Sequence, residues 1–193
     1  MVAAVFQQIL KDLSSTTAIV GGHSVGAVAG LSALEVLALQ VSGIILIDGG
    51  YFNPFSTRSI KDQKDANRRF LDENVFPSWD HYLESEKSQS KIWNKNILLA
   101  SKAATVQTNN GTVKLRIGLN TLNQVTAFVR AFSLDNMSPH LVPALLLFGS
   151  RLVALQAEGR TEVSKLKMVL PSINMQQVNG KHDLLRITSC QVV

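Results

Sequence analysis

The sequence has little of several features that mark whole classes of protein. It contains a single cysteine, Cys190, in 193 residues, which excludes an internal disulfide and a zinc site built on several cysteines. Its longest apolar stretch, Leu141–Phe148 with Pro143 counted in, is eight residues, whereas a helix needs about 20 to span a membrane. The first residues carry neither a basic segment nor an apolar core of secretory length, so we expect no signal peptide. These absences favour a cytoplasmic protein with no metal or organic cofactor and no membrane partner.

Charged residues are also sparse, at 17% against 46% hydrophobic residues, which excludes a disordered or collagen-like chain. The 19 basic and 14 acidic residues give a net charge of +5 and a pI near 9.5. The densest basic group, between Arg58 and Arg69, is interleaved with aspartates and has no aromatic platform beside it. This pattern is typical of a solvated helix face and predicts no nucleic-acid partner.

Short, continuous apolar runs separated by helical patterns are typical of a parallel α/β sheet. Four runs are predicted to be strands, at Thr17–Val20, Ile44–Ile47, Ala144–Phe148 and Ile173–Val178. Helices are predicted at 2–13, 27–39 and 156–169. We therefore predict an α/β protein with a parallel sheet of about four strands in the order of the chain, flanked by helices.

Residues 51–140 differ from the sequence on either side of them. They are polar, helical in pattern and interrupted by prolines, and they contain both tryptophans, Trp79 and Trp93. We interpret them as a helical insertion of about 90 residues. The predicted organisation is thus a core segment at 1–50, the insertion at 51–140 and a second core segment at 141–193.

The first predicted strand and the next helix are joined by Gly22-His23-Ser24-Val25-Gly26, which fits the pattern G-x-S-x-G. In such a turn the serine has a strained backbone, and Gly22 and Gly26 avoid collisions that a Cβ would cause. The serine oxygen is then exposed, and the N–H of Val25 at the helix start is placed to stabilise an oxyanion. Two rival interpretations are a glycine-rich turn without a catalytic role and a dinucleotide-binding turn. The second fails because His23 stands where its middle glycine would be.

A serine hydroxyl needs a neighbouring base to act as a nucleophile. Of the four histidines, His182 is the favoured base because it follows the last predicted strand and a turn at Asn179-Gly180. The side chain of His23 is expected to point away from the serine, and His81 and His140 lie in or at the end of the insertion. The alternative for His182 is an exposed loop histidine.

Four stretches together resemble the α/β-hydrolase superfamily in order and spacing: Ile19–Ala27, Ile44–Asp48, Pro143–Gly149 and Gly180–Asp183. By that resemblance they are the nucleophile strand and elbow, the next core strand, the strand that usually precedes the acid, and the histidine loop. The insertion resembles the helical cap of some members. The resemblance implies a serine hydrolase that cleaves an ester, amide or similar acyl bond of a small molecule through an acyl-enzyme on Ser24. Epoxide-opening relatives, which carry an acidic nucleophile, are disfavoured.

The sequence departs from the family's pattern at the acid. No carboxylate follows Gly149 closely, but some members carry the acid after the preceding strand, at the position of Asp48. The resemblance therefore implies the triad Ser24, His182 and Asp48, with Asp48 as the group that orients the histidine. A simple turn residue is an equally open interpretation of Asp48, and Glu158 is a weaker substitute.

The second departure lies before the elbow strand, where the family normally has several more strands and this sequence has one helix. We therefore expect an N-terminally truncated member in which the strand at Thr17–Val20 forms a sheet edge. That strand carries no lysine or proline to block pairing, which predicts self-association through the edge. An inactive, hydrolase-like fragment that acts as a binding or interaction module remains the alternative function.

Overall fold

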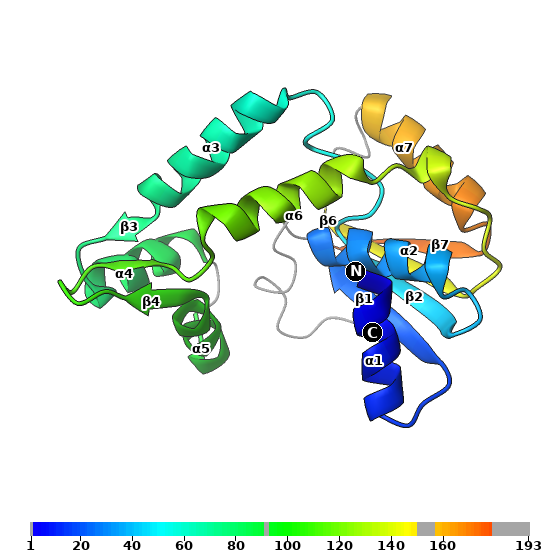
Figure 1. Ribbon diagram of the computed structural model, residues 1–193, viewed down its shortest axis with the longest axis horizontal. Helices are drawn as coiled ribbons and strands as arrows, with labels where there is room; N and C mark the ends of the chain where they lie inside the picture. Colours follow the sequence, from blue (N-terminus) through cyan, green and yellow to red (C-terminus); the bar gives the residue numbers. More distant parts are fainter. Residues whose placement is uncertain (1, 91–92, 150–156, 179–193) are drawn as a thin grey trace. The chain divides into compact units, whose positions relative to one another are not determined.

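The computed structural model describes residues 2–90, 93–149 and 157–178, with side chains from 161 onward in the last range (Figure 1). The chain forms two compact units. Among the described residues, the first unit comprises 2–54, 129–149 and 157–178, and the second comprises 55–90 and 93–128. None of the helices in the described ranges is long and apolar enough to cross a membrane. The domain boundaries expected at 50 and 140 stay predictions.

The first unit is built on a parallel sheet with the strand order β1-β2-β6-β7, which confirms the predicted four strands in chain order. Its strands are β1 (Ala18–His23), β2 (Val41–Ile47), β6 (Ala144–Gly149) and β7 (Ile173–Val178). The helices of this unit are α1 (Val2–Asp12), α2 (Val25–Val36) and α7 (Ala157–Val169), with a short 3-10 helix, η1 (Leu134–Asn136). The strand β1 continues through Gly21, Gly22 and His23, beyond the end expected from its apolar run.

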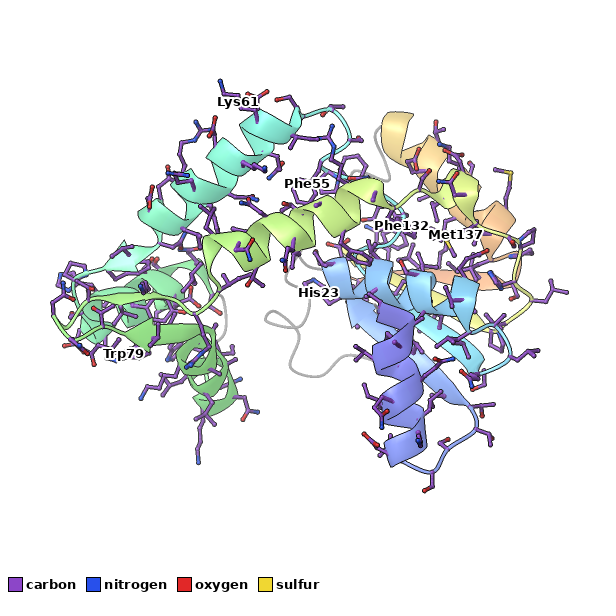
Figure 2. All side chains as sticks on the ribbon, in the orientation of Figure 1. His23, Phe55, Lys61, Trp79, Phe132 and Met137 are labelled. Atoms are coloured by element: carbon purple, nitrogen blue, oxygen red, sulfur yellow. The ribbon has the colours of Figure 1, made fainter. Side chains whose placement is uncertain are left out.

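One face of this sheet forms the core of the first unit. Ile44, Leu46 and Leu146 are at most 1% exposed and pack in one cluster with the side chains of α2 and α7. Phe132 and Met137 cover part of the same cluster (Figure 2). Because successive strand residues point to opposite faces, Ile19 lies on the other face, and it is 65% exposed.

The strand β1 is an edge of the sheet as far as the described residues show, since its one partner among them is β2. An apolar edge strand without lysine or proline favours pairing with a further strand. Self-association through this edge stays a prediction.

The second unit contains a small antiparallel sheet that the helical pattern of the insertion did not predict. Its order is β3-β5-β4, from β3 (Val75–Phe76), β4 (Thr105–Gln107) and β5 (Val113–Leu115). The helices are α3 (Ile60–Glu73), α4 (Trp79–Gln89), α5 (Lys95–Ala104) and most of α6 (Leu119–Ala131). The Tyr82 ring is buried and meets Phe76 and Trp79 edge to face, with centroids 5.1 and 5.8 Å away. Trp79 therefore contributes to the packing of this unit (Figure 2).

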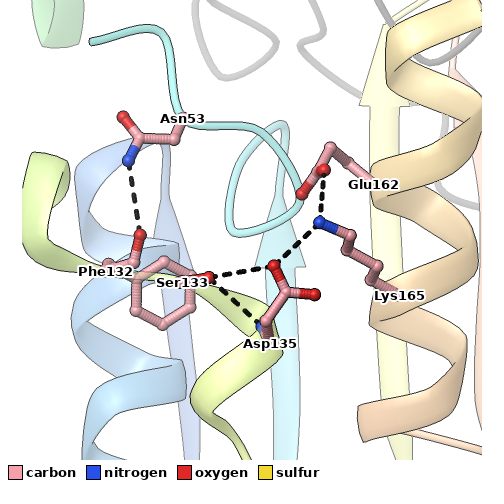
Figure 3. Close-up of polar contacts among 6 residues, drawn as sticks. All are labelled: Asn53, Phe132, Ser133, Asp135, Glu162 and Lys165. Carbon is pink, nitrogen blue, oxygen red and sulfur yellow. Dashed lines mark hydrogen bonds and ion pairs between the residues drawn. The ribbon is translucent and has the colours of Figure 1, made fainter. Parts of the chain in front are cut away.

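Within the first unit, polar side chains fix the segment that follows α6. The Asn53 amide Nδ2 donates hydrogen bonds to the carbonyls of Val129, Arg130 and Phe132 at 3.0, 3.2 and 3.3 Å. The Lys165 ammonium on α7 lies 2.9 Å from Asp135 and 3.0 Å from Glu162 (Figure 3). These contacts hold the end of α6 and η1 in place beside the core.

Candidate active site

Ser24 lies at the turn between β1 and α2 in a backbone conformation that is rare for a residue with a side chain. Its φ is 54° and its ψ is −115°. Such a conformation costs about 1–3 kcal/mol and persists where its surroundings fix it. The Ser24 N–H donates to the carbonyl of Ile47 at 2.9 Å, and the Ser24 carbonyl accepts from the N–H of Ala27 at 3.0 Å. This is the sharp strand-to-helix turn that G-x-S-x-G predicts.

Glycines make this turn possible because other backbone atoms lie very close to it. A Cβ added at Gly22 would lie 2.2 Å from the carbonyl carbon and oxygen of Gly26. A Cβ added at Gly49 would lie 2.5 Å from the Ser24 carbonyl oxygen and 2.7 Å from the Ser24 Cα. At Gly26 itself an added Cβ would have no described atom within 4 Å apart from its chain neighbours and the backbone of its own helix. The steric requirement expected at both motif glycines is therefore visible at Gly22, and Gly49 carries one that the motif did not indicate.

Asp48 follows β2 as Ser24 follows β1. The preceding residues, His23 and Ile47, are register partners, so the two side chains emerge at the same end of adjacent strands. Asp48 is 5% exposed and also has a positive φ, 44°. Its N–H donates to the carbonyl of Leu147 at 2.8 Å, and its Oδ1 accepts a hydrogen bond from the Tyr51 hydroxyl at 3.1 Å. The structure thus brings two of the three predicted triad residues, Ser24 and Asp48, together at the carboxyl ends of β1 and β2.

The predicted oxyanion donor, Val25, is the first residue of α2. N–H groups in the first turn of a helix have no acceptor within the helix and lie at the positive end of its dipole. A carbonyl oxygen that becomes negative beside Ser24 would be stabilised at this position.

The histidines are distributed unequally around this turn. His140 Nε2 lies 2.9 Å from the Glu35 carboxylate. Glu35 is eleven positions after Ser24, which places it about 16 Å along α2 from the turn. His140 is therefore too distant to serve as the base. His81 is in α4 of the second unit, with its Nδ1 2.9 Å from the Ser78 hydroxyl. The favoured base, His182, lies outside the described residues, as does the loop after Gly149. Glu158 falls within α7, with its side chain outside the described ones.

Within the described ranges no three histidine, cysteine, aspartate or glutamate side chains come together as metal ligands.

No protein-family model and no curated protein matches the sequence. Solved structures do match. They include an E-2-(acetamidomethylene)succinate hydrolase, with a TM-score of 0.70 and 17% identity over 96% of this chain and 67% of that one. A thioesterase domain from the curacin biosynthetic pathway has a TM-score of 0.68 and 16% identity over 95% and 67%. The peroxisomal α/β-hydrolase Lpx1 from Saccharomyces cerevisiae has a TM-score of 0.65 and 14% identity over 92% of this chain and 53% of that one.

These matches show the fold. The chain has part of the α/β-hydrolase fold and spans between about half and two thirds of the length of these structures.

Proposed function

We propose that the protein is a serine hydrolase that cleaves an ester, amide or similar acyl bond of a small molecule. The observation that carries the proposal is Ser24, held with φ 54° between β1 and α2 by the close approach of Gly49. Support comes from the fold, which is shared in part with a hydrolase and a thioesterase domain. A serine in this conformation directs its oxygen away from the backbone of the turn, where an acyl group has access to it.

The reaction follows from the roles of these groups. The Ser24 hydroxyl oxygen attacks the acyl carbon while His182 accepts its proton, and the N–H of Val25 stabilises the negative oxygen of the tetrahedral intermediate. His182 then donates the proton to the leaving group, whose bond to the acyl carbon breaks. A water molecule, deprotonated by His182, releases the acyl group as an acid and restores Ser24. Asp48 holds His182 in the required tautomer.

Labelling with a fluorophosphonate probe tests the proposal. We expect Ser24→Ala to abolish labelling and His182→Ala to slow it about 100-fold or more, since an unassisted hydroxyl reacts slowly. Ser32→Ala is the matched control, because Ser32 lies on the same helix and its hydroxyl donates to the Val28 carbonyl. Equal, background labelling of the wild type and Ser24→Ala would overturn the proposal.

A non-catalytic binding module is the second candidate, and the edge strand β1 with its exposed Ile19 favours it. The same experiment separates the two. A module predicts background labelling of the wild type together with self-association in light scattering, which Ala18→Lys on β1 would reduce.

A further inference from the structure

The turn after β2 is built so that Tyr51 reaches back to Asp48. Gly50 has a φ of +82°, and a Cβ there would lie 2.8 Å from Cδ1 of Leu31 on α2. The turn therefore packs closely against the core. Tyr51 is 5% exposed, and its ring belongs to the core cluster. From that position its hydroxyl donates to Asp48 Oδ1 at 3.1 Å. A buried ring, rather than a mobile surface chain, fixes the place of this donor.

The phenol keeps its proton. Burial raises the pKa of Tyr51 far above its usual range, and the negative charge of Asp48 and the hydrogen bond to it raise the pKa further. A phenol has one hydrogen, and here it is directed at the carboxylate. The raised pKa keeps Tyr51 in the protonated form that donates to Asp48.

The Tyr51 hydroxyl also limits the orientations of the Asp48 carboxylate. The terminal torsion of an aspartate is broad and roughly two-fold, so an unsupported carboxylate samples many orientations. A hydrogen bond to one oxygen limits that rotation.

We propose that Tyr51 is a positioning residue of the active site, whose hydroxyl orients the Asp48 carboxylate for its bond to the catalytic histidine. The inference rests on the proposed function, and it assigns a role to the hydroxyl that is separate from the packing of the ring.

A double-mutant cycle on the rate of fluorophosphonate labelling tests whether Tyr51 acts through Asp48. Tyr51→Phe keeps the ring and should slow labelling about 10- to 150-fold, the range expected when one hydrogen bond to a charged group is lost. In an Asp48→Asn background, Tyr51→Phe should slow labelling less than about twofold, because the carboxylate through which Tyr51 acts is gone. Tyr82→Phe is the control, since Tyr82 is the other tyrosine of the sequence and its hydroxyl donates to the Ser101 carbonyl in the second unit.

The backgrounds are chosen to keep the turn intact. Asparagine tolerates the positive φ of Asp48, and Asp48→Gly supplies a second background if Asp48→Asn does not fold.

A spectroscopic signature checks the contact without any activity. In a Tyr82→Phe protein, Tyr51 is the one remaining tyrosine, and its 13Cζ resonance reports how strongly the phenol donates. We expect Asp48→Asn to shift this resonance, whereas Glu35→Gln, at the far end of α2, leaves it in place.

Each outcome decides one claim. Equal costs of Tyr51→Phe in both backgrounds, no cost in the wild type, or an unmoved 13Cζ resonance would overturn the positioning role. If the wild type labels no faster than Ser24→Ala, the proposed function fails and the positioning role with it. A shifted resonance in that case identifies the Tyr51–Asp48 bond as a structural contact.

Discussion

Gly49 lies closer to the backbone of Ser24 than any residue with a side chain would allow. A Cβ at this position would lie 2.5 Å from the Ser24 carbonyl oxygen, 2.7 Å from its Cα and 2.9 Å from its carbonyl carbon. All three atoms belong to the main chain, so no side chain is able to move aside. Gly49→Ala therefore forces the turn after β2 away from the turn that holds Ser24.

The size of the effect follows from how far these atoms must separate. Real Cβ atoms hardly ever approach within 3.0 Å of another heavy atom, so the carbonyl oxygen must retreat by at least about 0.5 Å (3.0 − 2.5). That oxygen accepts from Ala27, and the N–H of Ser24 donates to Ile47, so the shift strains both bonds. Overpacking costs typically about 1–3 kcal/mol, and we expect the upper part of that range. For a chain of this size, the melting temperature should fall by roughly 5–10 °C.

Thermal unfolding followed by far-UV circular dichroism measures this loss. Tryptophan fluorescence is unsuitable, because Trp79 and Trp93 both lie in the second unit and report on its unfolding. Gly26→Ala is the matched control within the same turn, since its added Cβ has no described atom within 4 Å outside its chain neighbours and the backbone of its own helix. Alanine is also favoured over glycine in a helix by up to about 1 kcal/mol, so this variant should be as stable as the wild type or more so.

A Gly49→Ala protein that melts with the wild type and labels at the same rate would refute the packing of Gly49 on Ser24. If Gly26→Ala were the less stable of the two, the same conclusion would follow.

Two further predictions concern the first unit away from the proposed active site. Asn53→Ala removes the donor to the carbonyls of Val129 and Arg130 at the end of α6 and of Phe132 just after it. This should lower the free energy of unfolding by about 1–2 kcal/mol in urea, and an unchanged midpoint would contradict it. The hydrogen bond from His140 lowers the pKa of Glu35 below its ordinary 4.5, against the opposing effect of burial. Stability from this pair is thus present above about pH 4.5 and is lost as the pH falls towards the lower, folded-state pKa. Glu35→Gln should flatten the fall in stability between about pH 5 and pH 3, and an unaltered slope would show that the pair does not contribute.

The parallel sheet could be predicted because most of its strands have sequences of consecutive apolar residues. The residues of Ile44–Ile47 and Ala144–Phe148 are buried or partly buried, and their composition is apolar throughout. The end of β1 could not be predicted in this way. Gly21, Gly22 and His23 have no apolar pattern, and they extend the strand because their pairing with β2 continues to Ile47.

The small sheet of the second unit had no signal of its own. β3 has two residues and β4 and β5 have three each, which is too short for the alternation that identifies a strand. These strands exist through their pairing with one another, and the first and last of them are separated by two helices in the sequence.

The proposed active site could likewise be predicted only in part. Ser24 could be identified from five consecutive residues, because the elbow is a local structure. The role of Gly49 depends on a contact with a residue 25 positions earlier, which no local pattern contains. Tyr51 had a weak local signal, a tyrosine three residues after a strand-ending aspartate with two glycines between them. That arrangement predicts a turn, and whether the tyrosine faces the carboxylate depends on the burial of its ring.

Backbone strain provides an independent reason to regard these residues as one site. Of the non-glycine residues with a positive φ in the described part of the chain, Ser14, Ser24 and Asp48, two occupy the same end of neighbouring strands. Each such conformation costs about 1–3 kcal/mol, and glycine at either position would avoid much of that cost. Stability alone would therefore not favour a serine and an aspartate here. The proposed nucleophile and acid, which must project from the ends of two adjacent strands, would favour these residues, and the close packing of Gly49 on Ser24 holds the turn at Ser24 in place.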